Sequence, residues 1–329
     1  MRNRWITFSG LFAAINTEYK SLNMPNINLN GQTVKVDNGT AQKITNLAKE
    51  PKIKAIAKEF WTDRKLGKHD ELVGDYVSIL EKTLLIDPDE FRADLFKSTL
   101  QPGKMADKLT ALLAKTSLRD DLKKEYISMC LGVTTTRPAI GKGEFLFAAT
   151  FKNIGFSSNV GDLIDLDTGR KIEVKGVGAP LGNGQNKAFK PMTARLMKDI
   201  CRELQINDMK DWALNQENAY KIKKALGLNE KKAMQIFTYL QNLWKEDNGV
   251  SRAATKLYFD KGQLIRTVAA MHLYCYMKVE ENDYLLIVND DEFRMFNAPQ
   301  DLYEAYDIIS KMSINAWREG EYGIKVTLR

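Results

Sequence analysis

The spacing of apolar residues changes along the chain and divides it into stretches of different character. Residues 1–40 are rich in Asn and Gly and show no sustained period, which predicts an irregular N-terminal arm. From about residue 41 the apolar positions recur at helical spacing; Leu72, Tyr76 and Ile79, for example, follow i, i+4 and i+7. The stretch 41–140 is therefore predicted to be a helical N-terminal domain.

A segment rich in glycine, proline and threonine at 132–142 marks the start of a different pattern. Beyond it, alternation of apolar and polar residues predicts strands at 161–166 and 171–176. A long helical stretch, an apolar helix, a strand pair, another helix and a last strand follow. This order predicts an α/β core over 141–329, a mixed β-sheet flanked by helices, with a helical insertion at about 188–262.

Composition narrows the class of protein. Hydrophobic residues make up 44% of the chain and charged residues 28%, which is ordinary for a globular protein and excludes disordered and collagenous chains. The three cysteines, Cys130, Cys201 and Cys275, are scattered and odd in number, which fits a reducing compartment and excludes a disulfide scaffold. No apolar run reaches the length of about 18 residues that a membrane span needs, so a cytoplasmic location is expected.

Positive charge is concentrated in the predicted insertion. The whole chain carries a formal net charge of +7, and residues 181–262 alone hold 15 basic and 9 acidic side chains. The neighbouring stretch 141–180 is neutral, with 5 of each. Such a basic segment attracts polyanions such as nucleic acid. The alternative interpretation is a lysine-rich helical surface that only faces solvent.

The two predicted strands at 161–166 and 171–176 carry the side chains with the clearest chemistry. If Thr168-Gly169 is a two-residue turn, Asp162 faces Lys175, and Asp162 and Glu173 become diagonal neighbours on one face, about 7–8 Å apart. Two carboxylates at that separation can share a hard divalent cation. A register shifted by one residue would place Asp162 on the opposite face.

This set of side chains suits phosphodiester hydrolysis. A divalent ion polarises a phosphoryl oxygen and lowers the pKa of a bound water. Lys175 could orient the attacking water and offset charge in the transition state. Glu144, upstream on a predicted helix, could complete the shell of the ion.

The motifs resemble those of the PD-(D/E)XK nuclease superfamily, whose fold is that of restriction endonucleases, and they look most like phage-encoded members. The matching residues are Gly143-Glu144, then Gly161-Asp162-Leu163, then Ile172-Glu173-Val174-Lys175-Gly176. The resemblance covers about 143–176. It implies a restriction-endonuclease-like α/β fold and Mg²⁺-dependent DNA cleavage, with endonuclease action favoured over exonuclease action.

The resemblance also implies a role for each site residue. Asp162 and Glu173 would bind Mg²⁺, for which Mn²⁺ is a substitute, together with the main-chain carbonyl of Val174. Lys175 would act on the water, and Glu144 would be an accessory acid and metal ligand. DNA is the implied partner, a homodimer and phage or virion partners are further expectations, and the location would be the host cytoplasm or the virion.

Residues that follow the motif could contact nucleic acid. Gln185 lies in a glycine-rich loop, and Lys187, Lys190, Arg195 and Lys198 open the basic insertion. A plain loop and a solvated helix face are the alternatives. For the whole chain, the alternative to an enzyme is a non-catalytic DNA-binding or virion structural protein that keeps the nuclease-like core. A helical adaptor with an unrelated sheet is a third interpretation.

Overall fold

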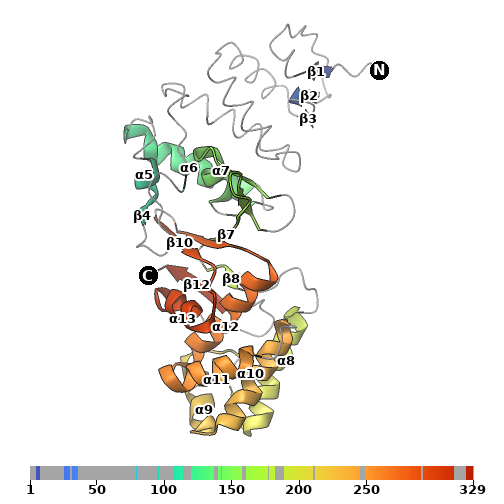
Figure 1. Cartoon of the computed structure of the whole chain (residues 1–329), viewed down its shortest axis with the longest axis vertical. Coiled ribbons are helices and arrows are strands. Elements are labelled where there is room, and N and C mark those ends of the chain that lie inside the picture. The colour runs from blue at the N-terminus through green and yellow to red at the C-terminus, as the bar shows by residue number, and fades with distance from the viewer. Residues whose placement is uncertain are drawn as a thin grey trace. The chain divides into compact units, whose positions relative to one another are not determined.

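The structure is a computed structural model of the whole chain, drawn in Figure 1. It describes residues 5–7, 26–29, 32–35, 79, 95, 107–113, 120–136, 140–141, 143–157, 161–176, 178–181, 189–209, 212–244, 249–289, 292–314 and 324–328. Most of the expected arm at 1–40 and most of the expected helical domain at 41–140 lie outside these residues. Both therefore stay predictions.

The chain divides into two compact units. The first consists of Met1–Gln101 and Asp107–Val174, and the second of Pro102–Ala106 and Lys175–Arg329. Helices and strands occur in both units, which confirms the α/β class. The division falls inside one strand, and the expected start of the core at residue 141 is a different division that stays a prediction.

In the first unit, short helices precede an antiparallel three-stranded meander. Strand β5 pairs with β6 and β6 pairs with β7, while β1, β2 and β3 form a separate small sheet. The elements are β1 (Trp5–Thr7), β2 (Asn26–Leu29), β3 (Gln32–Lys35), β4 (Asp107–Lys108), α5 (Leu109–Leu112), α6 (Asp120–Thr136), α7 (Glu144–Thr150), β5 (Ile154–Phe156), β6 (Leu163–Asp165) and β7 (Lys171–Gly176), whose last two residues belong to the second unit.

Helix α7 anchors the meander because it is buried along its whole length. Phe145 and Phe147 have no exposed surface, and Tyr126 of α6 lies with its hydroxyl 3.4 Å from Thr150 Oγ1. Helix α6 continues through Gly132 to Thr136, so the first residues of the glycine-, proline- and threonine-rich segment at 132–142 are helical. A glycine inside a helix costs only about 1 kcal/mol, which the packing of α6 on α7 can offset.

The second unit combines a group of helices with two sets of strands. Strands β9 and β10 form an antiparallel hairpin, and β12 lies between β11 and β8. The elements are β8 (Pro180–Leu181), α8 (Phe189–Leu204), α9 (Gln216–Leu226), α10 (Glu230–Trp244), α11 (Val250–Lys261), α12 (Leu264–Val279), β9 (Tyr284–Val288), β10 (Glu292–Asn297), α13 (Leu302–Ser310), β11 (Met312–Ile314) and β12 (Ile324–Leu328). Helices α8 to α11 occupy the stretch 188–262, where the sequence predicts a helical insertion.

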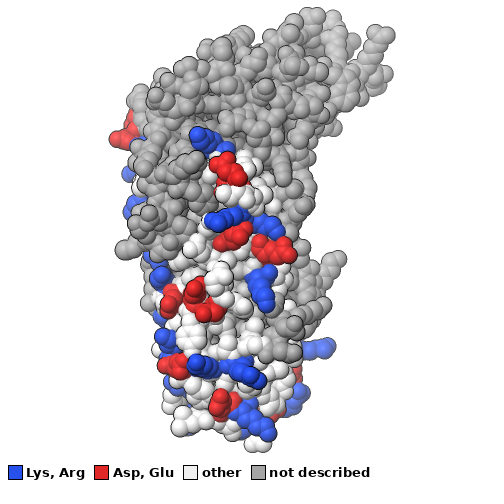
Figure 2. Space-filling view, viewed as in Figure 1, with Lys and Arg blue, Asp and Glu red and all other residues white. Residues whose placement is uncertain are grey.

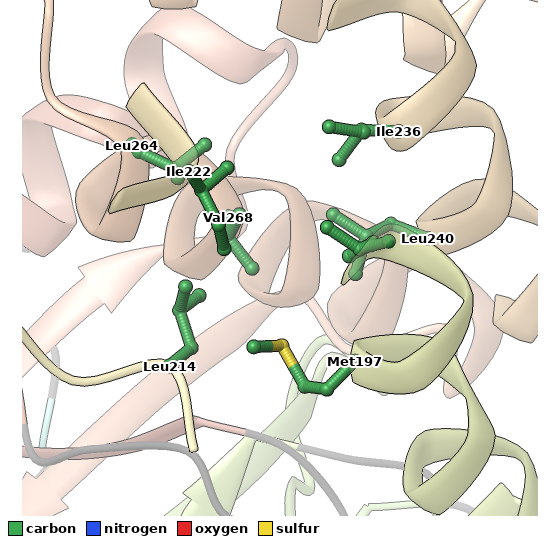
Figure 3. Close-up of a pocket in the computed structure, with 8 residues that line it drawn as sticks. Met197, Leu214, Ile222, Ile236, Leu240, Leu264 and Val268 are labelled. Carbon is green, nitrogen blue, oxygen red and sulfur yellow. The ribbon is translucent and has the colours of Figure 1, made fainter. Parts of the chain in front are cut away.

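An apolar core joins these helices to one another. In Figure 1 helices α8 to α11 gather around the lower part of α12, whose side chains are buried on nearly every face. Figure 3 shows Met197, Ile222, Leu240 and Val268, which come from four different helices, converging on a small cavity with a purely apolar lining. Such a lining offers a water no hydrogen-bond partner, so the cavity is part of the packed core.

No helix in the part of the chain that the structure describes combines the length and the apolar character needed to cross a membrane.

Candidate functional site

The hairpin β6–β7 has a longer turn than the sequence predicts. Its register pairs Leu163 with Ile172 and Ile164 with Lys171. The expected two-residue turn, which would have set Ile164 opposite Glu173 and Asp162 opposite Lys175, is therefore wrong. The register therefore differs by two residues from the expected one.

Asp165, which ends β6, holds this turn together. It is buried, and its carboxylate accepts hydrogen bonds from the Asp167 N–H at 3.2 Å, the Thr168 hydroxyl and Asn153 Nδ2 at 3.3 Å. Gly169 closes the loop with a positive φ of 74° and donates its N–H to the Asp165 carbonyl at 2.7 Å. A side chain that binds its own turn in this way favours the longer loop, which explains the shift in register.

Asp162 lies at a β-bulge immediately before β6. Its N–H donates to the Ile172 carbonyl at 3.2 Å, although the register pairs Ile172 with Leu163. Two residues opposite one define a bulge, a feature that re-aims side chains next to active sites. The carboxylate Oδ2 of Asp162 accepts the Val174 N–H at 2.8 Å. The Asp162 carboxylate therefore lies against the part of β7 that contains Glu173.

Glu173 is buried, contrary to a simple alternation of exposed and buried positions. It is 5% exposed, and its strand neighbours Ile172 and Val174 are buried as well. Burial of an ionised carboxylate is costly unless hydrogen bonds, an opposite charge or a metal ion compensate it. The structure therefore holds one buried carboxylate in β7, in the strand segment against which the Asp162 carboxylate lies.

Glu144 begins α7, as the sequence predicts, but its side chain turns back on the preceding loop. Its Oε1 accepts the Gly141 N–H at 2.5 Å, and its own N–H donates to the Gly141 carbonyl at 3.3 Å. A Cβ at Gly141 would stand 2.0 Å from Oε1, so a larger residue there would displace the Glu144 carboxylate. This contact gives Glu144 a local structural role beside the predicted accessory one.

Lys175 follows Glu173 by two residues in β7 and is the first residue of the second unit. Its Nζ lies 5.1 Å from the centroid of the Tyr276 ring, in a cation–π contact. Tyr276 belongs to α12 and is buried, and its ring packs edge-on against Trp244. Trp244 in turn donates to His272 Nδ1 at 3.2 Å. The aromatic residues thus provide a fixed surface for the lysine.

His272 leads to a testable pH dependence. Burial lowers the pKa of His272 to about 3 in the folded chain, while the unfolded chain retains about 6.5. As the pH falls below 6.5, the His272 imidazole binds a proton in the unfolded state but stays neutral in the folded state. The free energy of unfolding therefore falls. Between pH 7 and pH 5 this loss is about 2 kcal/mol. Denaturant unfolding of the wild type and of His272→Gln at both pH values measures it, and equal losses in the two proteins would contradict the assignment.

The predicted nucleic-acid contacts are only partly within the described residues. Gln185 and Lys187 lie outside them, and of Lys190 the structure describes only its place in α8. Arg195 and Lys198 are exposed on α8, with Lys198 Nζ 5.6 Å from the centroid of the Trp212 ring.

Acidic side chains compensate part of the basic surface of the second unit. Lys221 forms ion pairs with Asp208 and Glu217, and Arg202 pairs with Asp199. Figure 2 shows Lys and Arg interspersed with Asp and Glu over the described part of the visible face. On that face the charge pattern is that of a mixed surface, and a strongly basic patch is not evident.

Asp162 and Glu173 are the residues that could hold a metal ion. Carboxylate oxygens are the ligands that a hard cation such as Mg²⁺ prefers, so the donor set fits the implied ion. Among the described residues, no group of three or more His, Cys, Asp and Glu side chains is arranged to hold a metal. Glu144 therefore does not complete a ready-made cluster with these two.

Three residues of this region were missed in the sequence. Asp165 had a signal, since the stretch Asp165-Leu166-Asp167-Thr168-Gly169 is typical of a turn bound by its own side chains. Asn153, whose Oδ1 accepts the Leu95 N–H at 2.9 Å, and Tyr276 had none, because their contacts join distant parts of the chain.

Comparison with protein-family models, curated proteins and solved structures finds no match to this chain.

Proposed function

We propose that the chain is a Mg²⁺-dependent DNA nuclease that hydrolyses phosphodiester bonds, with Asp162, Glu173 and Lys175 as its central residues. The observation that carries this proposal is the hydrogen bond from the Val174 N–H to Asp162 Oδ2. It brings one carboxylate against the strand segment that holds a second, buried carboxylate. The resemblance of these motifs to the PD-(D/E)XK superfamily supports the same assignment.

Each residue has a role that its place in the structure supports. Asp162 and Glu173 would hold the cation, which when bound polarises a phosphoryl oxygen and lowers the pKa of its water. Asp162 is oriented for this by the Val174 amide, and Glu173 by its place in the middle of β7. Lys175 would orient the attacking water and offset negative charge on the phosphate. Its contact with Tyr276 restricts where the ammonium group can lie.

The Glu144 carboxylate would take part as an accessory acid through the oxygen that does not receive the Gly141 amide. Its position at the start of α7 also places it next to the positive end of the helix dipole, although a helix of this length has a weak one. We assign Glu144 mainly to the stability of the loop before α7.

The test is a cleavage assay on the purified full chain. Supercoiled plasmid, linear duplex and single-stranded DNA are incubated with Mg²⁺, Mn²⁺ or EDTA, beside Asp162→Ala and Lys175→Ala. Metal-dependent cutting that both substitutions abolish would support the proposal, and the substrate cut fastest would separate endonuclease from exonuclease action. Cutting that survives both would place the active site elsewhere. DNA retardation in a gel without cutting would favour the non-catalytic DNA-binding protein.

A further inference from the structure

Arg294, in strand β10 of the second unit, is a charged side chain in an apolar setting. It is 8% exposed, and its partner across the hairpin is Ile287. On the same face of the strand, two residues along, lies Phe296, which is 1% exposed. Removing a guanidinium from water is costly unless hydrogen bonds and an opposite charge replace the lost solvent.

Among the residues that the structure describes, little of that compensation is present. Arg294 Nη1 donates to the Lys311 carbonyl at 3.3 Å, and the guanidinium lies with its Cζ 6.0 Å from the centroid of the Phe296 ring. Its Nε is buried without a hydrogen-bond partner, and none of the ion pairs among the described residues includes it. Lys311 is the C-cap of α13, so the helix end offers about half a negative charge.

A second cation contacts the same aromatic ring. The Nζ of Lys311 lies 6.0 Å from the centroid of the same Phe296 ring. Lys311 is exposed and belongs to none of the ion pairs among the described residues. Two positive groups gathered at one ring repel each other, and a negative group bound between them would relieve that repulsion.

We propose that Arg294 and Lys311 form a binding site for a phosphate group. A guanidinium presents a planar fork of N–H donors that matches phosphate oxygens, and an ammonium adds a point charge. Of the guanidinium nitrogens, only Nε is both buried and without a partner, which leaves the outer nitrogens to meet the ligand. The phosphate could come from a small molecule or from a nucleic-acid backbone. The proposed phosphate site does not depend on whether the chain cleaves DNA.

The first arm of the test uses inorganic phosphate and thermal unfolding of the full chain at constant ionic strength. Saturating phosphate is expected to raise the Tm of the wild type by about 3 °C or more relative to chloride. Arg294→Met should lose this rise and, without phosphate, should melt at the wild-type temperature or above it. Lys311→Gln should show a smaller rise. The control Arg252→Gln removes an exposed arginine of α11 and should respond as the wild type does.

The second arm identifies the source of the phosphate. In EDTA, which prevents metal-dependent cutting, the affinity for a labelled duplex is measured by fluorescence anisotropy at several salt concentrations. A backbone phosphate at this site predicts binding about 10-fold weaker in Arg294→Met and a salt slope smaller by about one. Phosphate stabilisation with unchanged duplex affinity would assign the site to a small phosphate. Absence of any phosphate effect in the wild type would overturn the proposal and leave Arg294 as a cap of α13.

Discussion

Replacing Glu173 with glutamine is expected to reduce Mg²⁺-dependent DNA cleavage by about 10³-fold or more. The amide keeps the size of the side chain but removes the charge that would hold the cation. A bound metal contributes several kcal/mol to the transition state, and each 1.36 kcal/mol changes the rate about tenfold. Because Glu173 is buried, the Tm of the variant is measured beside that of the wild type, which separates loss of the metal ligand from loss of folding.

A matched control comes from the same hairpin. Asp167 is exposed in the β6–β7 turn, and Asp167→Asn removes the same charge from a position outside the proposed site. We expect its cleavage rate to stay within about twofold of the wild type, as for other surface substitutions. Comparable losses in Glu173→Gln and Asp167→Asn would show that the charge of the hairpin, and not a specific metal ligand, supports activity. Full activity of Glu173→Gln would show that the Glu173 carboxylate is not needed to hold the metal ion.

Replacing Leu240 with alanine is expected to destabilise the chain by about 2–5 kcal/mol. Leu240 is 1% exposed and lines the apolar cavity among the helices of the second unit, with Met197 and Val268 across it. Shortening the side chain removes its packing and enlarges a cavity that the surrounding helices can fill only by moving. Urea unfolding followed by circular dichroism measures the change.

Leu228 offers the same substitution without the burial. It is 93% exposed at the turn between α9 and α10, so Leu228→Ala should change the free energy of unfolding by no more than about 0.5 kcal/mol. A difference of at least 1.5 kcal/mol between the two leucine variants is the expected result. Equal effects would mean that the packing around the cavity contributes little to stability.

Local patterns in the sequence were sufficient to locate most elements of the second half. Strands β7 and β10 have the predicted bounds, 171–176 and 292–297. Helix α10 begins one residue before the predicted 231–244, and α12 lies within two residues of the predicted 263–277, because alternation and helical spacing are short-range signals. The helix that the resemblance implies at Glu144 also begins there.

Three features of the candidate site needed the structure. The register of β6 against β7 depends on the hydrogen bonds of one side chain, Asp165, and a pattern of apolar residues does not encode them. The cation–π contact between Lys175 and Tyr276 joins residues about a hundred positions apart, and only the packing of α12 brings them together. The burial of Glu173 likewise depends on what covers the strand, which a period of two cannot indicate.

The hydrogen bond between Asp162 and Val174 also makes one backbone amide sensitive to events at a carboxylate. The amide proton of Val174 exchanges with solvent only when its hydrogen bond to Asp162 Oδ2 is broken. The exchange rate of this amide therefore depends on the negative charge on Oδ2. A cation that draws on this charge, or a proton added at low pH, weakens the bond and shifts the amide resonance. Val174 therefore offers a spectroscopic probe of the site that requires no substrate and no turnover.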